Sequence, residues 1–386
     1  MSFLAASSIP VFVKTLMGLE EVLADELKTL GAEDLHIGTR GVACTVSEEV
    51  LYRLLIHSRL AIRILIRINE SKIQNEQELY DWVRTIDWHD YFSLKHSFAF
   101  DVVSFHSQMN HTVFLAQKAK DAIVDQFRDR YAMRPNVSPK DPDLRINLHI
   151  SNDGSAHLGL DASGRSMNQR GYRQGAGKAA INEVLAAGLI SLSLWDPETP
   201  FVDIMCGSGT FAIEAALIAK NRAPALNNDS FGIKRWPLFR ASLWKRLMDE
   251  ARRSEKRGVD WIYGNDIDPR TVDVFRKNVR AARLSKNIRI SNLPFQKMWI
   301  PEGNGTIISN PPYGDHIGDR NELKKMYEEL GQVLKYKAQG YKAYFITPDK
   351  RFKETISLKH GKIFHVLNGA TPCEFISYSI GPKKQG

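Results

Sequence analysis

The residues of this chain that are best suited to chemistry form a tetrapeptide, Asn310-Pro311-Pro312-Tyr313, which follows the apolar segment 306–309. The amino nitrogen of a nucleobase is a poor nucleophile because its lone pair is delocalised into the ring. Two hydrogen-bond acceptors can hold its protons and localise that lone pair, and the Asn310 side-chain oxygen and the Pro311 carbonyl could provide both. Consecutive prolines fix φ and hold this carbonyl in place, and Tyr313 could stack on the base. In isolation, the same tetrapeptide could be a turn that ends a strand.

A second candidate site is the glycine turn Gly207-Ser208-Gly209, which lies between an apolar strand and a helix that begins at Thr210. Glycines let the backbone approach a ligand closely, and a helix N-terminus offers unpaired N–H groups. Such a turn is typical of sites for S-adenosylmethionine. It is also typical of dinucleotide sites, because Gly207, Gly209 and Ala212 match the fingerprint G-x-G-x-x-A. A glycine turn that binds no ligand is the third interpretation.

Polar residues at three strand ends favour S-adenosylmethionine over a dinucleotide. Asp203 stands inside the strand before the glycine turn, where a carboxylate can face the ammonium group of methionine but would repel a pyrophosphate. The next acidic strand end is Asp266, after a long basic stretch, and an acid there can bind the ribose diol of either cofactor. Asn292 ends the following strand and could accept a hydrogen bond from the adenine amino group, or it could be an ordinary loop residue.

The elements that would position these residues fall into three units. The first unit has predicted strands at 11–15, 34–38, 41–46 and 61–68 and predicted helices at 18–30 and 48–57, in the β-α-β-β-α-β order of a ferredoxin-like unit. The second unit has predicted strands at 98–105, 144–151 and 155–163 and a predicted helix at 113–131. From a predicted helix at 179–194 onward, helices alternate with short apolar strands, which indicates a doubly wound parallel sheet.

Composition and charge narrow the class of protein. The net charge is +9, but residues 1–160 carry −4 and residues 161–386 carry +13, so the second half favours a polyanionic partner such as nucleic acid. Cys44, Cys206 and Cys373 lie too far apart for a zinc site, so we expect no metal and a reduced, cytoplasmic protein. No apolar run reaches the length of a membrane span, and the first residues do not resemble a secretory signal.

Together these motifs resemble the THUMP-domain class I RNA methyltransferases, in particular the bacterial group similar to the large-subunit ribosomal RNA guanine-N2 methyltransferase. The resemblance covers nearly the whole chain. LDASGRSMNQRGYR (160–173) is similar to the family's junction before the catalytic domain, and DIMCGSGT, GNDIDP and NPPYG are similar to catalytic-domain motifs. It implies an α/β fold in which a ferredoxin-like domain (1–70) and an α+β THUMP RNA-binding domain (71–162) precede a Rossmann-like methyltransferase domain (163–386).

The resemblance also implies the chemistry. The cofactor would be S-adenosylmethionine, the partner RNA, with ribosomal RNA favoured, and the target guanine N2 of 23S ribosomal RNA. Relatives usually have Asp where Asn292 stands, and an acidic residue and Arg after NPPYG, where this chain has Asp315 and His316. The residues implied at the acceptor site are Asn310, Pro311, Pro312 and Tyr313, and those expected around the cofactor are Asp203, Cys206, Gly207, Ser208, Gly209, Thr210, Asp266, Ile267, Asn292 and Asn310.

A segment similar to a family-specific insertion (221–244), with the basic stretch that follows it, is the other candidate for RNA binding. Its many cations lie among Trp236, Phe239 and Trp244, a mixture that suits RNA phosphates and unstacked bases. The alternative is an amphipathic helix whose aromatic side chains pack inward. The first two units are acidic overall, so RNA docking there requires that their lysines and arginines cluster on one face.

Several other functions are compatible with parts of the sequence. A transfer-RNA guanine-N2 methyltransferase or a DNA adenine-N6 methyltransferase would use the same acceptor motif. A nicotinamide oxidoreductase would use the glycine turn but would leave the Asn-Pro-Pro-Tyr motif without a role. A non-catalytic RNA-binding or assembly factor would retain an inactive cofactor pocket. The sequence defines neither the modified nucleotide nor the oligomeric state.

Overall fold

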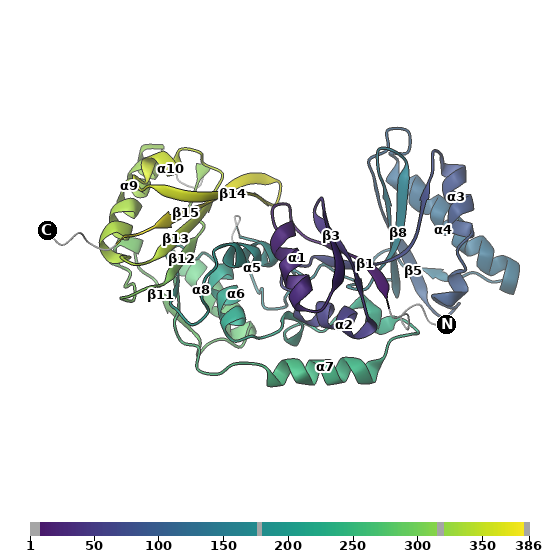
Figure 1. Cartoon of the computed structure of the whole chain (residues 1–386), viewed down its shortest axis with the longest axis horizontal. Helices are drawn as coiled ribbons and strands as arrows, with labels where there is room; N and C mark the ends of the chain where they lie inside the picture. Colours follow the sequence, from purple (N-terminus) through teal and green to yellow (C-terminus); the bar gives the residue numbers. More distant parts are fainter. Residues whose placement is uncertain (1–7, 176–179, 315–319, 382–386) are drawn as a thin grey trace.

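The computed structural model describes residues 8–175, 180–314 and 320–381, which form two β-sheets with helices packed on them (Figure 1). The N-terminal sheet has eight strands in the order β2-β3-β1-β4-β8-β7-β5-β6. The strands are β1 (Ile9–Lys14), β2 (Glu33–Gly38), β3 (Gly41–Val46), β4 (Arg63–Lys72), β5 (Ser97–Ser104), β6 (Asn136–Val137), β7 (Leu144–Ile150) and β8 (Ser155–Asp161), and the helices are α1 (Glu20–Thr29), α2 (Glu48–His57), α3 (Glu76–Arg84) and α4 (Thr112–Tyr131). The predicted ferredoxin-like order of elements is confirmed.

Strand β4 connects the first two units, because it pairs with β1 on one side and with β8 on the other. Along β1, buried and partly exposed side chains alternate, and every second side chain of β7 from Leu144 to Ile150 is fully buried, so one face of the sheet carries the apolar core. Helices α1 to α4 cover that face. In Figure 1, α1 and α2 flank the strands on one side and α3 and α4 on the other, so the sheet curves with its helices outside.

Local capping explains one helix that the sequence analysis does not assign. The Asn75 side chain accepts hydrogen bonds from the backbone N–H groups of Gln77 and Glu78, and the Glu78 carboxylate accepts one from the N–H of Gln74. These bonds cap the start of α3 in a variant of the capping box, and Asn-x-x-Glu is the sequence signal that could have found it. Its apolar residues Leu79 and Val83 then face the core.

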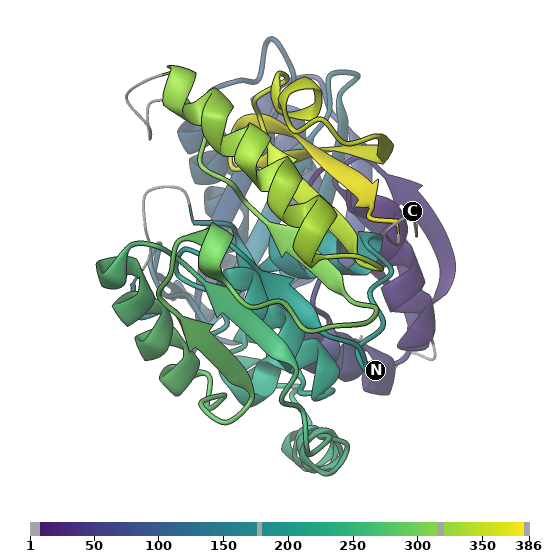
Figure 2. The ribbon, with the colours of Figure 1, turned by 90° about the vertical axis from the view of Figure 1, so that its left-hand side faces the viewer.

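The C-terminal sheet has seven strands in the order β11-β10-β9-β12-β13-β15-β14, and its first five strands run parallel. Helices α5, α6 and α8 pack on one face, and α9 crosses the other (Figure 2). The strands are β9 (Phe201–Asp203), β10 (Ile262–Asn265), β11 (Ile288–Ser291), β12 (Thr306–Ser309), β13 (Lys342–Thr347), β14 (His360–Asn368) and β15 (Thr371–Ser379), and the helices are α5 (Glu183–Leu192), α6 (Thr210–Ala219), α7 (Ala241–Arg253), α8 (Pro269–Ala281), α9 (Arg320–Lys337) and α10 (Phe352–Thr355). This confirms the predicted doubly wound architecture.

In the C-terminal half, one helix begins later than predicted, and a few residues named in the sequence analysis are not among those that the structure describes. Helix α5 begins at Glu183, later than predicted, because the Asn182 side chain caps it by accepting from the N–H groups of Val184 and Leu185. Residue 179 of the predicted helix, and Asp315 and His316 after the acceptor motif, lie outside the described residues. None of the described helices is both long and apolar enough to cross a membrane.

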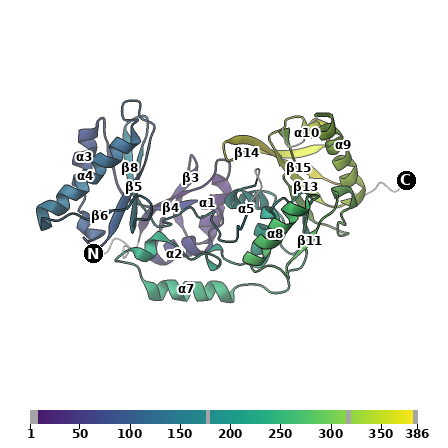
Figure 3. The ribbon, with the colours of Figure 1, turned by 180° about the vertical axis from the view of Figure 1, so that it is seen from behind.

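The insertion packs on the N-terminal sheet's helices and does not offer its tryptophans to a ligand. Helix α7 runs along α2 (Figure 3), and Trp236 and Trp244 are each only 4% exposed within the N-terminal core. Arg240 pairs with Glu48 at 2.8 Å, and Arg246 pairs with Glu49 at 2.7 Å. The prediction that these aromatic side chains stack on RNA bases is therefore wrong for the tryptophans, because burial in an apolar core is the lower-energy place for them.

Candidate active site

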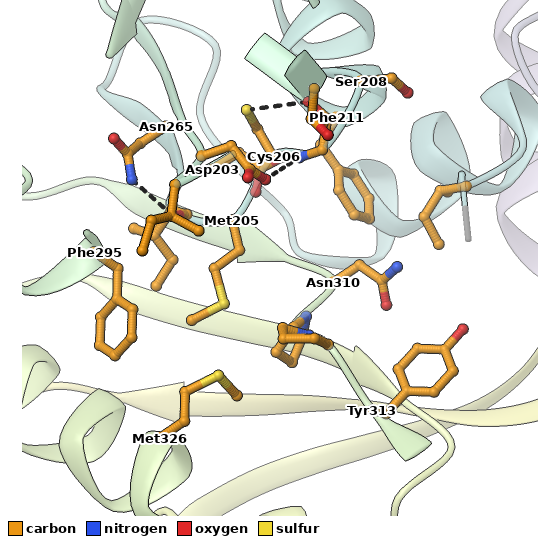
Figure 4. Close-up of a pocket in the computed structure, with 18 of the residues that line it drawn as sticks. Asp203, Met205, Cys206, Ser208, Phe211, Asn265, Phe295, Asn310, Tyr313 and Met326 are labelled. Carbon is orange, nitrogen blue, oxygen red and sulfur yellow. Dashed lines mark hydrogen bonds between the residues drawn. The ribbon is translucent and has the colours of Figure 1, made fainter. Parts of the chain in front are cut away.

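The carboxyl ends of β9, β10 and β12 meet around a cavity of about 830 Å³ (Figure 4). Ligands of open α/β sheets bind at this edge, and small-molecule sites have volumes of roughly 300–1,000 Å³. The residues predicted for the cofactor and the acceptor that line this one cavity are Asp203, Cys206, Gly207, Ser208, Thr210, Asp266, Ile267, Asn310, Pro311, Pro312 and Tyr313. Gly209 and Asn292 are not among its lining residues.

The glycine turn places two glycines in the left-handed region for different reasons. Gly207 has φ +53°, and a Cβ added to it would meet no atom within 4 Å, so its hydrogen faces open space in the cavity. Gly209 has φ +84° and precedes α6, and a Cβ added there would lie 1.8 Å from the ring of Phe275. Gly207 thus leaves room for a ligand, whereas Gly209 leaves room for the core.

Asp203 is the buried acid of the cavity. It is 1% exposed, and its Oδ1 accepts a hydrogen bond from the Ser309 hydroxyl at 2.5 Å. The same hydroxyl accepts from the N–H of Met205 at 3.0 Å, so Ser309 fixes the carboxylate relative to the glycine turn. Burial, together with the nearby charge of Asp266, raises the pKa of Asp203 to about 7. A cationic group of a ligand at this carboxylate would oppose that shift, because it stabilises the ionised form.

Asp266 and Asn265 hold the neighbouring loops in place. The Asp266 Oδ2 accepts from the N–H of Gly207 at 2.8 Å, which links the end of β10 to the glycine turn. The buried Asn265 side chain donates to the carbonyls of Ile204 and Leu293, and its oxygen accepts from the Ser291 hydroxyl at 2.7 Å. This amide therefore connects three strand ends, a role that the sequence does not reveal.

Asn292 serves a structural purpose in this arrangement. Its side-chain nitrogen donates to the backbone carbonyls of Asp266 at 2.8 Å and Ile267 at 3.0 Å. Those bonds shape the loop that lines the cavity, and the side chain itself is exposed. A contact between Asn292 and an adenine amino group stays a prediction.

The Asn310-Pro311-Pro312-Tyr313 motif follows β12 and lines the same cavity as the glycine turn. Pro311 is buried, and the carbonyl of Pro312 accepts a hydrogen bond from the Tyr327 hydroxyl of α9 at 3.1 Å. The Tyr313 hydroxyl is hydrogen-bonded to the Asn368 side chain of β14, and burial raises the pKa of Tyr313. In the view of Figure 4, Asn310 and Tyr313 lie on one side of the cavity and Phe295 lies on the other.

Several lining residues were not predicted from the sequence. Phe295 and Gln296 follow β11, and Lys325, Met326 and Glu329 come from α9. Gln296 donates to the Glu329 carboxylate at 2.6 Å, which ties the two segments together. Their spacing gives no signal, because the helix reaches the site only through the packing of α9 on the sheet.

Helix α6, which begins at the glycine turn, accepts hydrogen bonds at both ends from arginines that are not part of the C-terminal sheet. At its C-terminal end, the Arg59 guanidinium donates to the carbonyls of Leu217 and Arg222 at 3.2 and 2.9 Å. Cations at this end complement the helix dipole. At its N-terminal end, the Arg173 guanidinium donates to the Thr210 hydroxyl at 3.3 Å.

The middle of α6 is held by the junction segment before the catalytic domain. Glu214 is fully buried, accepts a hydrogen bond from the Tyr172 hydroxyl at 2.9 Å and pairs with Arg170 at 3.7 Å. Arg170, which is 2% exposed, also donates to the carbonyls of Met167 and Arg59. Burial raises the pKa of Glu214, and the positive charges of Arg170 and Arg59 oppose that shift. The N-terminal half and α6 therefore share one buried polar network.

The cavity as a whole fits S-adenosylmethionine. Its volume suits a nucleoside cofactor, Gly207 leaves space for close approach, and Asp203 offers a buried carboxylate to an ammonium group. Asp266 stands at the second strand end, where an acid can meet a ribose. Fold and site together define a class I S-adenosylmethionine-dependent methyltransferase.

Comparisons with known proteins give the family. Three models match: the RMKL-like methyltransferase domain at 170–376, the THUMP domain at 74–161 and the RlmL ferredoxin-like domain at 10–65. A protein of Synechocystis sp. named "Putative RNA methyltransferase slr0064" is 36% identical over 98% of this chain and 99% of its own. The chain belongs to this family of THUMP-domain, S-adenosylmethionine-dependent methyltransferases.

Solved structures agree over the whole length. SMU.472, described as a "putative methyltransferase" and solved with S-adenosylhomocysteine, has a TM-score of 0.89 at 29% identity, covering 98% of this chain and 100% of its own. A Listeria monocytogenes protein described as a "predicted N6-adenine-specific DNA methylase" has a TM-score of 0.88 at 27% identity, covering 98% of both chains. S-adenosylmethionine is therefore the cofactor of this family, and the oxidoreductase interpretation is not supported.

Proposed function

We propose that this methyltransferase acts on RNA and transfers the methyl group to an exocyclic base amino group, guanine N2 of 23S ribosomal RNA. RNA as the substrate class is supported by the THUMP domain and by the Synechocystis relative's name. The single observation that carries the chemistry is that Asn310 and Pro311 line the same cavity as Asp203 and Gly207. Guanine N2 and ribosomal RNA rest on the resemblance of the sequence motifs.

The cofactor supplies an electrophilic methyl group, and the chain supplies position and hydrogen bonds. The Asn310 side-chain oxygen and the Pro311 carbonyl would accept hydrogen bonds from the two N–H groups of the target amino group, which directs its lone pair outward; one of these protons leaves when the methyl group has been transferred. Tyr327 keeps the Asn-Pro-Pro turn rigid through its bond to the Pro312 carbonyl. The Tyr313 ring, positioned through Asn368, supplies a stacking surface for the base. Asp203 and Asp266 would hold the ammonium and ribose groups of the cofactor.

The test uses the purified chain, S-adenosylmethionine and four substrates: undermethylated 23S and 16S ribosomal RNA, transfer RNA and duplex DNA. Nucleoside mass spectrometry identifies the product. We expect N2-methylguanosine in 23S RNA. Product only in transfer RNA, only as N6-methyladenine in DNA, or in none of the four would refute the proposed substrate.

Asn310→Ala tests the acceptor role. Removal of one preorganised hydrogen-bond partner of a reacting group reduces kcat by roughly 100- to 1,000-fold, whereas S-adenosylhomocysteine should still bind to the variant. The matched control is Asn304→Ala, an exposed asparagine in the turn before β12. Wild-type turnover in Asn310→Ala would exclude Asn310 from the acceptor site.

A further inference from the structure

We propose that Gly18 of the N-terminal half and Asn368 of the C-terminal half are positioning residues for the target base. They act through the tip of the β14–β15 hairpin (366–373), which joins the loop before α1 to the Tyr313 ring of the acceptor motif. This inference rests on the proposed function, because it assumes that Tyr313 stacks on the base.

The tip of this hairpin extends beyond the strand that supports its base. The pairing of β13 with β15 ends at Thr347 and Glu374. From Val366 to Asn368, β14 pairs only with residues 371–373 of β15, among the residues that the structure describes. A two-stranded hairpin without further packing is marginally stable at best, so contacts outside the sheet must fix the position of this tip.

The first of these contacts is made by the loop before α1 (15–19). A Cβ added to Gly18 would lie 2.5 Å from the carbonyl oxygen of His365 and 3.1 Å from the Val366 side chain, so the loop backbone and β14 are in contact. Gly18 has φ +89°, a conformation that favours glycine. Figures 1 and 3 show β14 reaching from the C-terminal sheet toward α1. The backbone of the N-terminal half therefore lies directly against the tip.

The loop before α1 is itself held in place from two sides. The Glu20 carboxylate accepts hydrogen bonds from the N–H groups of Gly18 at 2.8 Å and Arg40 at 2.9 Å, which ties the loop to the turn between β2 and β3. The Leu19 side chain is fully buried in a core cluster of the C-terminal half, beside Gly188 of α5. The loop is thus a fixed surface on which the tip can rest.

The second contact joins the tip to the acceptor motif. Asn368 comes three residues after His365, and its side chain is hydrogen-bonded to the Tyr313 hydroxyl. Burial raises the pKa of Tyr313 and this bond opposes the shift, so the Asn368 side-chain nitrogen is the donor. The hydroxyl is the end of the side chain farthest from the backbone, so this bond sets the direction of the ring.

The contacts form a short path from the N-terminal half to the acceptor site. It runs from the Gly18 backbone through the tip to the Tyr313 ring. A base can react only when its amino group faces the methyl group, and a misplacement of about 1 Å can cost about 100-fold in rate. None of the described residues that line the cavity comes from the N-terminal half, which therefore orients the target base only through this path.

The test measures the environment of residue 313 directly. Tyr313 is replaced by meta-fluorotyrosine in the full-length chain, and its fluorine resonance is recorded without RNA. Gly18→Ala adds a methyl group against the His365 carbonyl and displaces the tip, and Asn368→Ala removes the bond itself; both should shift the resonance. The matched control is Gly258→Ala, because Gly258 also has a positive φ, +80°, but a Cβ added there would meet no atom within 4 Å.

Kinetics on RNA give the second measurement. Gly18→Ala and Asn368→Ala should each reduce kcat by roughly 10- to 100-fold. Neither residue lines the cavity, so the affinity for S-adenosylhomocysteine should stay at the wild-type value. Because both variants act through one path, Gly18→Ala should have little further effect on kcat when Asn368→Ala is already present. A double variant whose kcat falls by the product of the two single losses would overturn the inference.

An unchanged fluorine resonance in Gly18→Ala would also overturn it, and so would an equal shift in Gly258→Ala. Thermal unfolding of each variant identifies a folding defect. If Gly18→Ala does not fold, Glu20→Ala repeats the test, because it loosens the same loop without adding an atom to it. The resonance is measured without RNA and tests the path of contacts alone, whereas a wild-type chain that methylates no RNA would contradict the proposed function instead.

Discussion

The two glycines of the cofactor turn allow a prediction whose magnitude can be worked from the structure. Gly207→Ala and Gly209→Ala are the same chemical change two residues apart, and both place alanine at positive φ. That conformation costs an L-residue about 1–2 kcal/mol. At Gly207 this is the whole cost to the folded chain, because nothing lies within 4 Å of the new methyl group.

At Gly209 the new methyl group would also overlap the buried ring of Phe275, with the nearest carbon at 1.8 Å. Insertion of a methyl group into a packed core typically costs a further 1–3 kcal/mol or so. We therefore expect Gly209→Ala to lower the free energy of unfolding by about 2–5 kcal/mol, a large part of the roughly 5–15 kcal/mol of a typical domain.

Ligand binding should show the opposite order. The Gly207→Ala methyl group projects into the cavity, so the affinity for S-adenosylhomocysteine should fall by at least about tenfold, or 1.4 kcal/mol. Urea unfolding measures stability, and isothermal titration calorimetry measures affinity. Unchanged affinity in Gly207→Ala would refute close approach of a ligand to the turn. Equal stability of the two variants would refute the packing role of Gly209. A second substitution, Phe275→Leu, should restore part of the stability that Gly209→Ala loses.

Three further predictions concern buried charge and capping. Burial raises the pKa of Asp203 to about 7, above its unfolded value near 4, so its contribution to stability is present at low pH and lost as pH rises through about 7. This loss falls between about pH 4 and about pH 7, where the folded chain keeps a proton that the unfolded chain has released. In thermal unfolding without cofactor, Asp203→Asn should lack it, and an unchanged pH dependence would contradict the assignment. In urea unfolding, Glu214→Ala should destabilise the chain by about 3–5 kcal/mol, because it leaves Arg170 buried and unpaired. The control Glu250→Ala removes half-exposed pairs with Arg53 and Arg246 and should cost at most about 1 kcal/mol. Similar costs for the two variants would argue against the buried network. Asp268→Ala removes the N-cap of α8 and should cost about 1 kcal/mol, and an unchanged melting temperature would show that the cap is dispensable.

The parts of the fold that could be predicted from the sequence are those in which local pattern and tertiary position agree. Helix α2 has the predicted bounds, because Ser47 caps it and its apolar residues keep a helical spacing. The strand ends at Asp203, Asp266 and Asn310 could be placed together because parallel strands bring their carboxyl ends to one edge of a sheet. Each of these inferences uses a rule that depends only on neighbouring residues or on strand direction.

The parts that could not be predicted depend on contacts between segments far apart in the chain. The cations and aromatics of the insertion suggested a nucleic-acid surface, yet Trp244 packs against Tyr52 with ring centroids 5.6 Å apart. The same composition serves either purpose, and only the apolar surface offered by α2 decides between them. Likewise, Lys325 and Met326 reach the cavity through the packing of α9, for which no spacing rule exists.

The buried network around α6 explains why the junction segment 160–173 has so particular a composition. A flexible linker would need only small and polar residues, whereas this segment buries Arg170 and Tyr172 against Glu214. A buried ionic pair of this kind adds little stability compared with apolar residues of the same size, but it is strongly selective for one geometry. The network joins the N-terminal half to α6, and α6 begins at the glycine turn. The network therefore fixes the position of the N-terminal half relative to the cavity. Glu214→Gln should therefore reduce methyl transfer to long RNA more than it reduces S-adenosylhomocysteine affinity, and equal losses of the two would mean that the network serves the cofactor helix alone.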